Sequence, residues 1–138
     1  MDQIISYVTG ISHIAIQVGD LKKAIEQYVL LGFIPDDGDV IVEEQFGIRT
    51  KVMRQGAHVI ELLSPLDEES PLAKQMENNK WYSLDHICYE VSDLDAQIAL
   101  LKKNRFIPTS QKRISGVWGK TVILMGHRKM GVIELIEK

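Results

Sequence analysis

ISHIAIQVGDLKKAI, at residues 11–25, decides the fold, because a closely similar stretch, LDHICYEVSDLDAQI, returns 73 residues later at residues 84–98. The same offset, without a gap, aligns FIP at residues 33–35 with FIP at residues 106–108. Self-similarity at a fixed spacing is the signature of a repeated structural unit. The chain is therefore predicted to be an internal duplication.

Each half begins with an apolar, β-branched stretch that is typical of a strand, at residues 11–18 and 84–91. Asp20 and Asp93 follow these stretches and are predicted helix N-caps, since a short carboxylate accepts hydrogen bonds from the amides of the first turn. Apolar residues then recur at helical spacing in both halves. A helix is therefore expected directly after each opening strand.

Each helix needs an end, and short strands follow it. Gly32 is predicted to end the first helix, and Asn104 is predicted to play the same part in the second. The later strands are expected at residues 39–44, 48–54 and 57–63 in the first half and at residues 107–113, 120–125 and 131–136 in the second.

These patterns predict an α+β protein made of two tandem βαβββ modules within one domain that covers the whole chain of 138 residues. The modules are expected at residues 10–66 and 82–138, and a linker at residues 67–81 joins them. Within the linker, Ser70-Pro71 indicates the start of a helix, because proline suits the first helical position.

The composition narrows the classes of protein that remain. The formal net charge is −3 at pH 7 and the pI is near 5.8, so the basic excess of a nucleic-acid-binding protein and the polybasic stripe of a membrane-surface protein are both missing. No apolar run approaches the roughly 20 residues of a membrane-spanning helix, and the opening MDQIISYVTG lacks the features of a signal peptide. A single cysteine, Cys88, excludes an internal disulfide and a thiolate-rich zinc site. We therefore expect a cytoplasmic protein with no nucleic-acid or membrane partner.

Each half also carries one histidine in its first strand and one glutamate in its last, 48 residues apart. All four lie inside apolar strand sequence, where an unpartnered carboxylate loses its hydration at a high cost. A divalent cation compensates two carboxylates and accepts two imidazoles, and this donor set suits Co, Ni, Mn or Zn. The predicted metal ligands are His13, Glu61, His86 and Glu134.

A simpler interpretation fits these residues when they are taken one at a time. Strand alternation allows both glutamates to face solvent while their apolar neighbours face the core, and a lone histidine in a strand is usually a core or surface residue. A duplicated unit must keep its apolar core positions in order to fold. Folding does not, however, require it to keep a histidine and a glutamate at matched positions in both halves. The matched spacing therefore favours the metal site.

The duplicated βαβββ unit with its His/Glu/His/Glu pattern resembles the vicinal oxygen chelate superfamily of glyoxalases, bleomycin-resistance proteins and dioxygenases. The resemblance runs from Ile11 to Glu137, and within the superfamily the likeness is strongest to the methylmalonyl-CoA epimerases. The stretch EEQFGI at residues 43–48 and the segment IELLSPLDEESPLAK at residues 60–74 carry that likeness. It implies a curved mixed sheet around a central cavity, and it places the four predicted ligands on the metal-binding positions of the family.

Two loops depart from the epimerase pattern. The glycine-rich stretch that usually precedes the seventh strand reads ISGVWGK at residues 114–120, and the HPK-type turn before the last strand reads GHRKM at residues 126–130. Both segments lie near the substrate in the family, so the acyl group or its carrier is expected to differ. Where some epimerases carry a second carboxylate base on the third strand, this chain has Thr50 and Lys51. The predicted substrate contacts are Gln45, Thr50, Trp118 and His127.

The resemblance implies metal-dependent epimerase or isomerase chemistry on a 2-substituted acyl-CoA thioester such as methylmalonyl-CoA. The cation stabilises an enolate as a Lewis acid, and a carboxylate removes and returns the α-proton. Glu134 is the first choice for this base and Glu61 the second. Two alternatives stay open: a glyoxalase-I-like lyase that acts on a hemithioacetal with the same ligand set, and a non-catalytic binding protein of the bleomycin-resistance type. The open strand edges and the modest size predict a homodimer.

Overall fold

The computed structural model describes residues 5–77 and 83–138. Residues 78–82, which include the end of the predicted linker and the first position of the predicted second module, lie outside the described residues. Within the described ranges, no helix is both long and apolar enough to cross a membrane.

The chain forms two compact units that follow the duplication. The N-terminal unit runs from His13 to Asp85. The C-terminal unit consists of two segments: the residues up to Ser12, and His86–Lys138. The units differ from the predicted modules at both boundaries. The residues up to Ser12 group with the second repeat, and the N-terminal unit extends past the predicted module end at residue 66 as far as Asp85.

Each unit has the predicted strand and helix followed by strands, but with four strands after the helix among the described residues, where three were predicted. The N-terminal unit adds a short strand at Ile34–Pro35, and the strand predicted at residues 107–113 is two short strands, Ile107–Pro108 and Arg113–Ile114.

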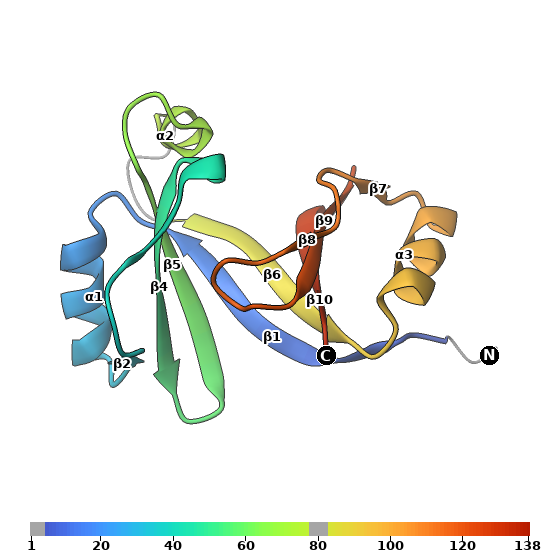
Figure 1. Cartoon of the computed structure of the whole chain (residues 1–138), viewed down its shortest axis with the longest axis horizontal. Helices are drawn as coiled ribbons and strands as arrows, with labels where there is room; N and C mark the ends of the chain where they lie inside the picture. Colours follow the sequence, from blue (N-terminus) through green and yellow to red (C-terminus); the bar gives the residue numbers. More distant parts are fainter. Residues whose placement is uncertain (1–4, 78–82) are drawn as a thin grey trace. The chain divides into compact units, whose positions relative to one another are not determined.

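The N-terminal unit contains every element predicted for it, together with a two-residue strand, β2, that the sequence did not predict (Figure 1). Its strands and helices are β1 (Val8–Gln17, of which residues 13–17 belong to this unit), α1 (Leu21–Leu30), β2 (Ile34–Pro35), β3 (Ile41–Glu43), the 3-10 turn η1 (Glu44–Phe46), β4 (Ile48–Gln55), β5 (His58–Pro65) and α2 (Pro71–Met76).

The sheet of this unit is mixed. β1 runs parallel to β5, β5 is antiparallel to β4, and β4 also pairs with β2 and β3. α1 contacts β4 and β5 (Figure 1), and the cluster on its face includes Met53, Ile60 and Leu62. On the other face, Ala15 and Leu63 pack with side chains of α2. The two helices therefore cover opposite faces of the sheet.

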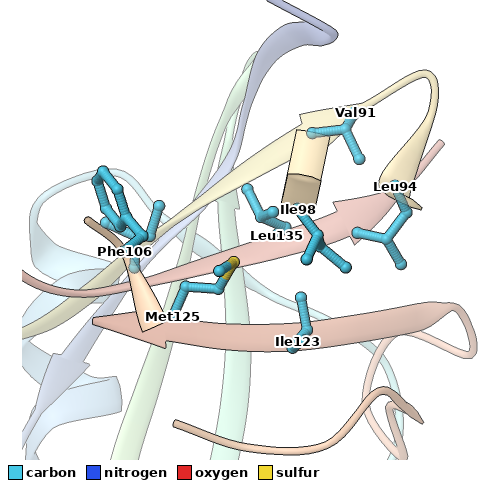
Figure 2. Close-up of a cluster of buried hydrophobic side chains, with 8 residues drawn as sticks. Val91, Leu94, Ile98, Phe106, Ile123, Met125 and Leu135 are labelled. Atoms are coloured by element: carbon cyan, nitrogen blue, oxygen red, sulfur yellow. The ribbon is translucent and has the colours of Figure 1, made fainter. Parts of the chain in front are cut away.

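The C-terminal unit repeats this plan. Its sheet pairs β6 parallel to β10 and β10 antiparallel to β9, while β7 and β8 both pair with β9. Figure 2 shows its core, in which Leu94 and Ile98 pack against β-strand side chains that include Ile123, Met125 and Leu135. Its elements are β6 (Ser83–Val91, of which residues 86–91 belong to this unit), α3 (Leu94–Lys103), β7 (Ile107–Pro108), β8 (Arg113–Ile114), β9 (Thr121–His127) and β10 (Gly131–Glu137).

The predicted helix starts are confirmed. The side chain of Asp20 accepts a hydrogen bond from the Lys23 amide, and that of Asp93 accepts one from the Ala96 amide. Ser70 caps α2 by accepting from an amide of its first turn. These caps satisfy amides that would otherwise have no partner at a helix start.

The predicted helix ends are confirmed in position, and the two halves differ in conformation. Gly32 follows α1 with φ +91°, in the left-handed region that glycine adopts without penalty. Asn104 is the C-cap of α3 and its Nδ2 donates a hydrogen bond to the Leu100 carbonyl at 2.8 Å, but its φ is −109° and therefore not left-handed. The left-handed residue there is Arg105, with φ 71°, which stands where the repeat has Gly32. A left-handed conformation brings the Cβ of an ordinary residue close to its own carbonyl and costs about 1–2 kcal/mol.

Arg105→Gly is therefore expected to raise the free energy of unfolding by up to about 1 kcal/mol, because relief of the strain exceeds the entropy that glycine adds to the unfolded chain. The matched change in the other half, Gly32→Ala, should lower it by about 1–2 kcal/mol, since a Cβ there lies 2.6 Å from Gln55 Nε2 as well as in a left-handed backbone. Urea unfolding of the two variants and the wild type measures both effects. Equal stability of the wild type and Arg105→Gly would show that the backbone at 105 is not strained.

Candidate metal centre

The N-terminal unit brings its predicted histidine and glutamate together. His13 lies on β1 and Glu61 on β5, and the parallel pairing places Ala15 opposite Glu61, two residues after the histidine. His13 Nε2 and Glu61 Oε1 are 3.5 Å apart. The side chains are buried, with 1% and 5% of their residue surfaces exposed.

The C-terminal unit repeats this geometry. His86 lies on β6 and Glu134 on β10, again in parallel strands, with Cys88 opposite Glu134. His86 Nε2 and Glu134 Oε1 are also 3.5 Å apart, and only 8% and 5% of the two residues is exposed. The duplication has therefore preserved the placement of the polar pair along with the apolar core.

Strand alternation explains why both glutamates are buried. Ile60 and Leu62 flank Glu61 and pack toward α1, so Glu61 points from the opposite face. Ile133 and Leu135 flank Glu134 and belong to the cluster under α3. The interpretation in which the glutamates face solvent is wrong, because neither carboxylate is exposed.

The distances within the pairs suit a shared cation. A charge-assisted hydrogen bond between an imidazolium and a carboxylate is about 2.7–2.9 Å long, which is shorter than the 3.5 Å in both units. Two neighbouring ligands, each bonded to one cation at about 2.1 Å, lie roughly 3.0–3.4 Å apart. Buried carboxylate and imidazole donors also form a set that divalent cations of the Co, Ni, Mn and Zn group accept. The residues present therefore fit such a cation.

Thr50 is the predicted substrate contact that the N-terminal unit places nearest to its pair. In the β4–β5 ladder, Val52 is opposite Glu61 and Thr50 is opposite Leu63, so Thr50 is a diagonal neighbour of Glu61 on the same face. It is 0% exposed, and its hydroxyl has no hydrogen-bond partner among the described residues. Gln45, in contrast, lies in η1 and is exposed.

The C-terminal unit separates the other two predicted contacts. Trp118 packs on Cys88, Val122 and Ile136, which belong to the face of the sheet that carries Glu134. The ring of His127 packs instead against Phe106, with ring centroids 4.7 Å apart, and Phe106 belongs to the cluster under α3. The structure therefore places Trp118 on the face of the His86–Glu134 pair and His127 on the opposite face.

Sequence reasoning missed Gln17, a buried residue on β1. Its Nε2 donates hydrogen bonds to Asp85 Oδ1 at 2.7 Å and to Gln75 Oε1 at 3.4 Å. Asp85 immediately precedes His86, so this bond holds the chain next to a predicted ligand. One signal was present in the sequence, because the repeat aligns Gln17 with another polar residue, Glu90. In the structure Glu90 also bonds within its own unit, where its Oε1 accepts a hydrogen bond from the Thr9 hydroxyl at 2.9 Å.

Comparison with known proteins gives one family. Residues 12–137 match the model of the glyoxalase/bleomycin resistance protein/dioxygenase superfamily. The human mitochondrial methylmalonyl-CoA epimerase is 31% identical over 135 residues, which cover 95% of this chain and 76% of the human protein. The ethylmalonyl-CoA/methylmalonyl-CoA epimerase of Cereibacter sphaeroides is 36% identical over 118 residues, with 83% and 86% covered. A solved structure of a methylmalonyl-CoA epimerase in complex with methylmalonyl-CoA and NH4+ superposes with a TM-score of 0.79 at 26% identity, with 95% of each chain covered.

Proposed function

The chain belongs to the glyoxalase/bleomycin resistance protein/dioxygenase superfamily, and from this membership we propose that it is a divalent-metal-dependent epimerase of 2-substituted malonyl-CoA thioesters such as methylmalonyl-CoA. The observation that carries the proposal is the buried His/Glu pair, repeated with the same 3.5 Å separation in both units. The names of the human and Cereibacter sphaeroides relatives support the choice of reaction and substrate class.

We propose that His13, Glu61, His86 and Glu134 together hold one cation of the Co, Ni, Mn or Zn group. The His/Glu pair of each unit supplies two donors, whereas a catalytic cation takes at least three protein ligands and leaves a position for water or substrate. Two duplicated pairs supply a set of four. When bound, the cation provides a Lewis acid that stabilises the negative charge of an enolate.

A carboxylate of the protein is proposed to carry out the proton transfer. In our proposal the carboxylate of Glu134 takes the α-proton from the substrate, and a proton is then returned to the opposite face of the same carbon, which inverts its configuration. Glu61 is the second candidate for the base. Substrate contacts are proposed for Gln45, Thr50 and Trp118.

His127 is the weakest of the four substrate contacts that the sequence predicted. Its ring packs on Phe106, and its Nδ1 accepts a hydrogen bond from the Lys129 amide at 3.1 Å. His127 stays a proposed contact, but its ring lies on the face of the sheet opposite to the His86–Glu134 pair. A homodimer and a cytoplasmic location also stay predictions; gel filtration with light scattering tests the first, and cell fractionation tests the second.

Deuterium exchange tests the proposed reaction. In D2O, the protein loaded with cation is expected to introduce deuterium at the α-carbon of methylmalonyl-CoA, because the enolate formed by loss of the α-proton is reprotonated from groups that have exchanged with the solvent. The hemithioacetal of methylglyoxal and glutathione serves as the comparison substrate. Turnover of the hemithioacetal without exchange of methylmalonyl-CoA would assign the glyoxalase-I-like lyase instead. Inactivity toward both, with methylmalonyl-CoA still bound, would favour a binding protein.

Thr50→Val should separate stability from function. Removing a buried hydroxyl that has no partner among the described residues is expected to raise the free energy of unfolding by up to about 1 kcal/mol. The same change should raise KM for methylmalonyl-CoA about fivefold, since a hydroxyl that binds substrate contributes roughly 1 kcal/mol. Thr50→Ser, which keeps the hydroxyl, is the control and should leave KM near the wild-type value. An unchanged KM in Thr50→Val would remove Thr50 from the substrate contacts.

A further inference from the structure

We propose that Trp118 sets the size of the apolar substituent that the enzyme accepts on the α-carbon of its substrate, and so acts as a specificity-determining residue. The inference rests on the proposed function, because it concerns the substrate of the same site. It comes from the packing and hydrogen bonds of the loop that carries Trp118, all of which lie within the C-terminal unit.

The loop between β8 and β9 holds Trp118 in a fixed place. The hydroxyl of Ser115, a buried residue, accepts hydrogen bonds from the amides of Val117 and Trp118, both at 3.1 Å. Main-chain bonds close the turn, with the Gly119 amide donating to the Ser115 carbonyl and the Ser115 amide donating to the Lys120 carbonyl, both at 2.9 Å. The indole is therefore presented by an ordered loop.

The surface beneath the indole is apolar and borders the His/Glu pair. Trp118 packs on Cys88, Val122 and Ile136, all of which are buried. Cys88 comes two residues after His86 and lies opposite Glu134 in the β6–β10 ladder, and Ile136 comes two residues after Glu134. Side chains two residues apart on a strand share a face, so the apolar surface begins where the polar pair ends.

The polar pair and the apolar surface beside it suit different parts of the substrate. Oxygen atoms of a malonyl thioester suit a cation that the polar pair would hold, whereas an alkyl group on the α-carbon suits the neighbouring apolar surface. The indole already covers that surface, so the room for the alkyl group depends on the size of residue 118. One methylene group in an apolar site is worth about 10–200-fold in discrimination, which is enough to separate methyl from longer substituents.

The test compares α-proton exchange of methyl-, ethyl- and butylmalonyl-CoA by the wild type, Trp118→Ala and Trp118→Leu. Trp118→Ala is expected to raise the ratio of kcat/KM for ethyl- over methylmalonyl-CoA at least tenfold, with a larger increase for the butyl compound. Trp118→Leu keeps an apolar cover on Cys88 and Ile136 and should shift the ratio in the same direction by a smaller factor. Thermal unfolding checks that each variant is folded, and Trp118→Leu serves if the alanine variant does not fold.

Tryptophan fluorescence provides a readout that does not depend on turnover. The chain has two tryptophans, at positions 81 and 118, so Trp81→Phe leaves the indole of Trp118 as the reporter. Methylmalonyl-CoA is expected to change its emission, whereas free CoA, which lacks the acyl group, should not. An identical response to both compounds would overturn the inference.

The two proposals fail in different ways. Exchange by the wild type with none of the three thioesters would contradict the proposed function. Exchange by the wild type, together with a selectivity ratio that stays within twofold in both Trp118→Ala and Trp118→Leu, would contradict the role of Trp118 alone.

Discussion

Glu134→Gln is expected to lower kcat for α-proton exchange by about 10²–10⁴-fold, the range that a positioned general base contributes. Glutamine keeps the shape of the side chain and one oxygen that can ligate a cation, but it cannot take a proton at neutral pH. The change therefore tests proton transfer with little disturbance of the site. Deuterium wash-in at the α-carbon of methylmalonyl-CoA measures it, with the bound cation quantified in the same sample.

The duplication supplies a matched control in Glu61→Gln. Glu61 occupies the same place relative to His13 as Glu134 does relative to His86, so the two variants alter equivalent positions. With Glu134 as the base, Glu61→Gln should keep more activity than Glu134→Gln. Equal losses in the two variants would indicate that both carboxylates move protons, and wild-type activity in Glu134→Gln would remove Glu134 from the role of base.

His13→Ala is expected to raise the dissociation constant for a divalent cation at least 100-fold. The change removes one of four proposed ligands, and it leaves the buried carboxylate of Glu61 without the imidazole that lies 3.5 Å away. His86→Ala should have an effect of similar size, since the proposal treats the two pairs as halves of one site. Isothermal titration with Co²⁺ or Zn²⁺ measures both constants.

His58→Ala controls for the loss of a histidine. His58 is an exposed residue in β5 of the same unit as His13, and it lies outside the repeated pattern. Its removal should leave the cation affinity unchanged. Wild-type affinity in His13→Ala would exclude His13 as a ligand, and an equal loss in His58→Ala would attribute the cation to surface histidines.

Most of the fold could be predicted from the sequence because the duplication shows the same pattern twice. Asp20 and Asp93 cap their helices as predicted, since the capping bond involves residues only three positions apart. The second helix ends at Asn104 as predicted, but the left-handed residue that follows could not be predicted, because arginine rarely takes that conformation and Arg105 does. Strand β2 was missed because two residues are too few to show a period.

The histidines and glutamates of the candidate site could be predicted from the sequence. Their orientation and the residues that surround them could be predicted only in part. Alternation left the direction of Glu61 open, and the packing of its neighbours against α1 decided it. The bond between Gln17 and Asp85 could not be predicted, because it joins residues 68 positions apart through strand packing. His127 was grouped with Trp118 because both segments lie near the substrate in the family that the sequence resembles, whereas the structure places the two on opposite faces of the sheet.

The central claim is that two duplicated half-sites hold one catalytic cation, and the number of cations per chain tests it most directly. Elemental analysis of protein saturated with Co²⁺ or Zn²⁺ and then freed of excess metal gives this number. We expect one cation per chain, which is lost in His13→Ala and in His86→Ala alike. Two cations per chain, each lost separately in one variant, would show that the pairs act independently. Absence of bound cation in the wild type would contradict the account as a whole.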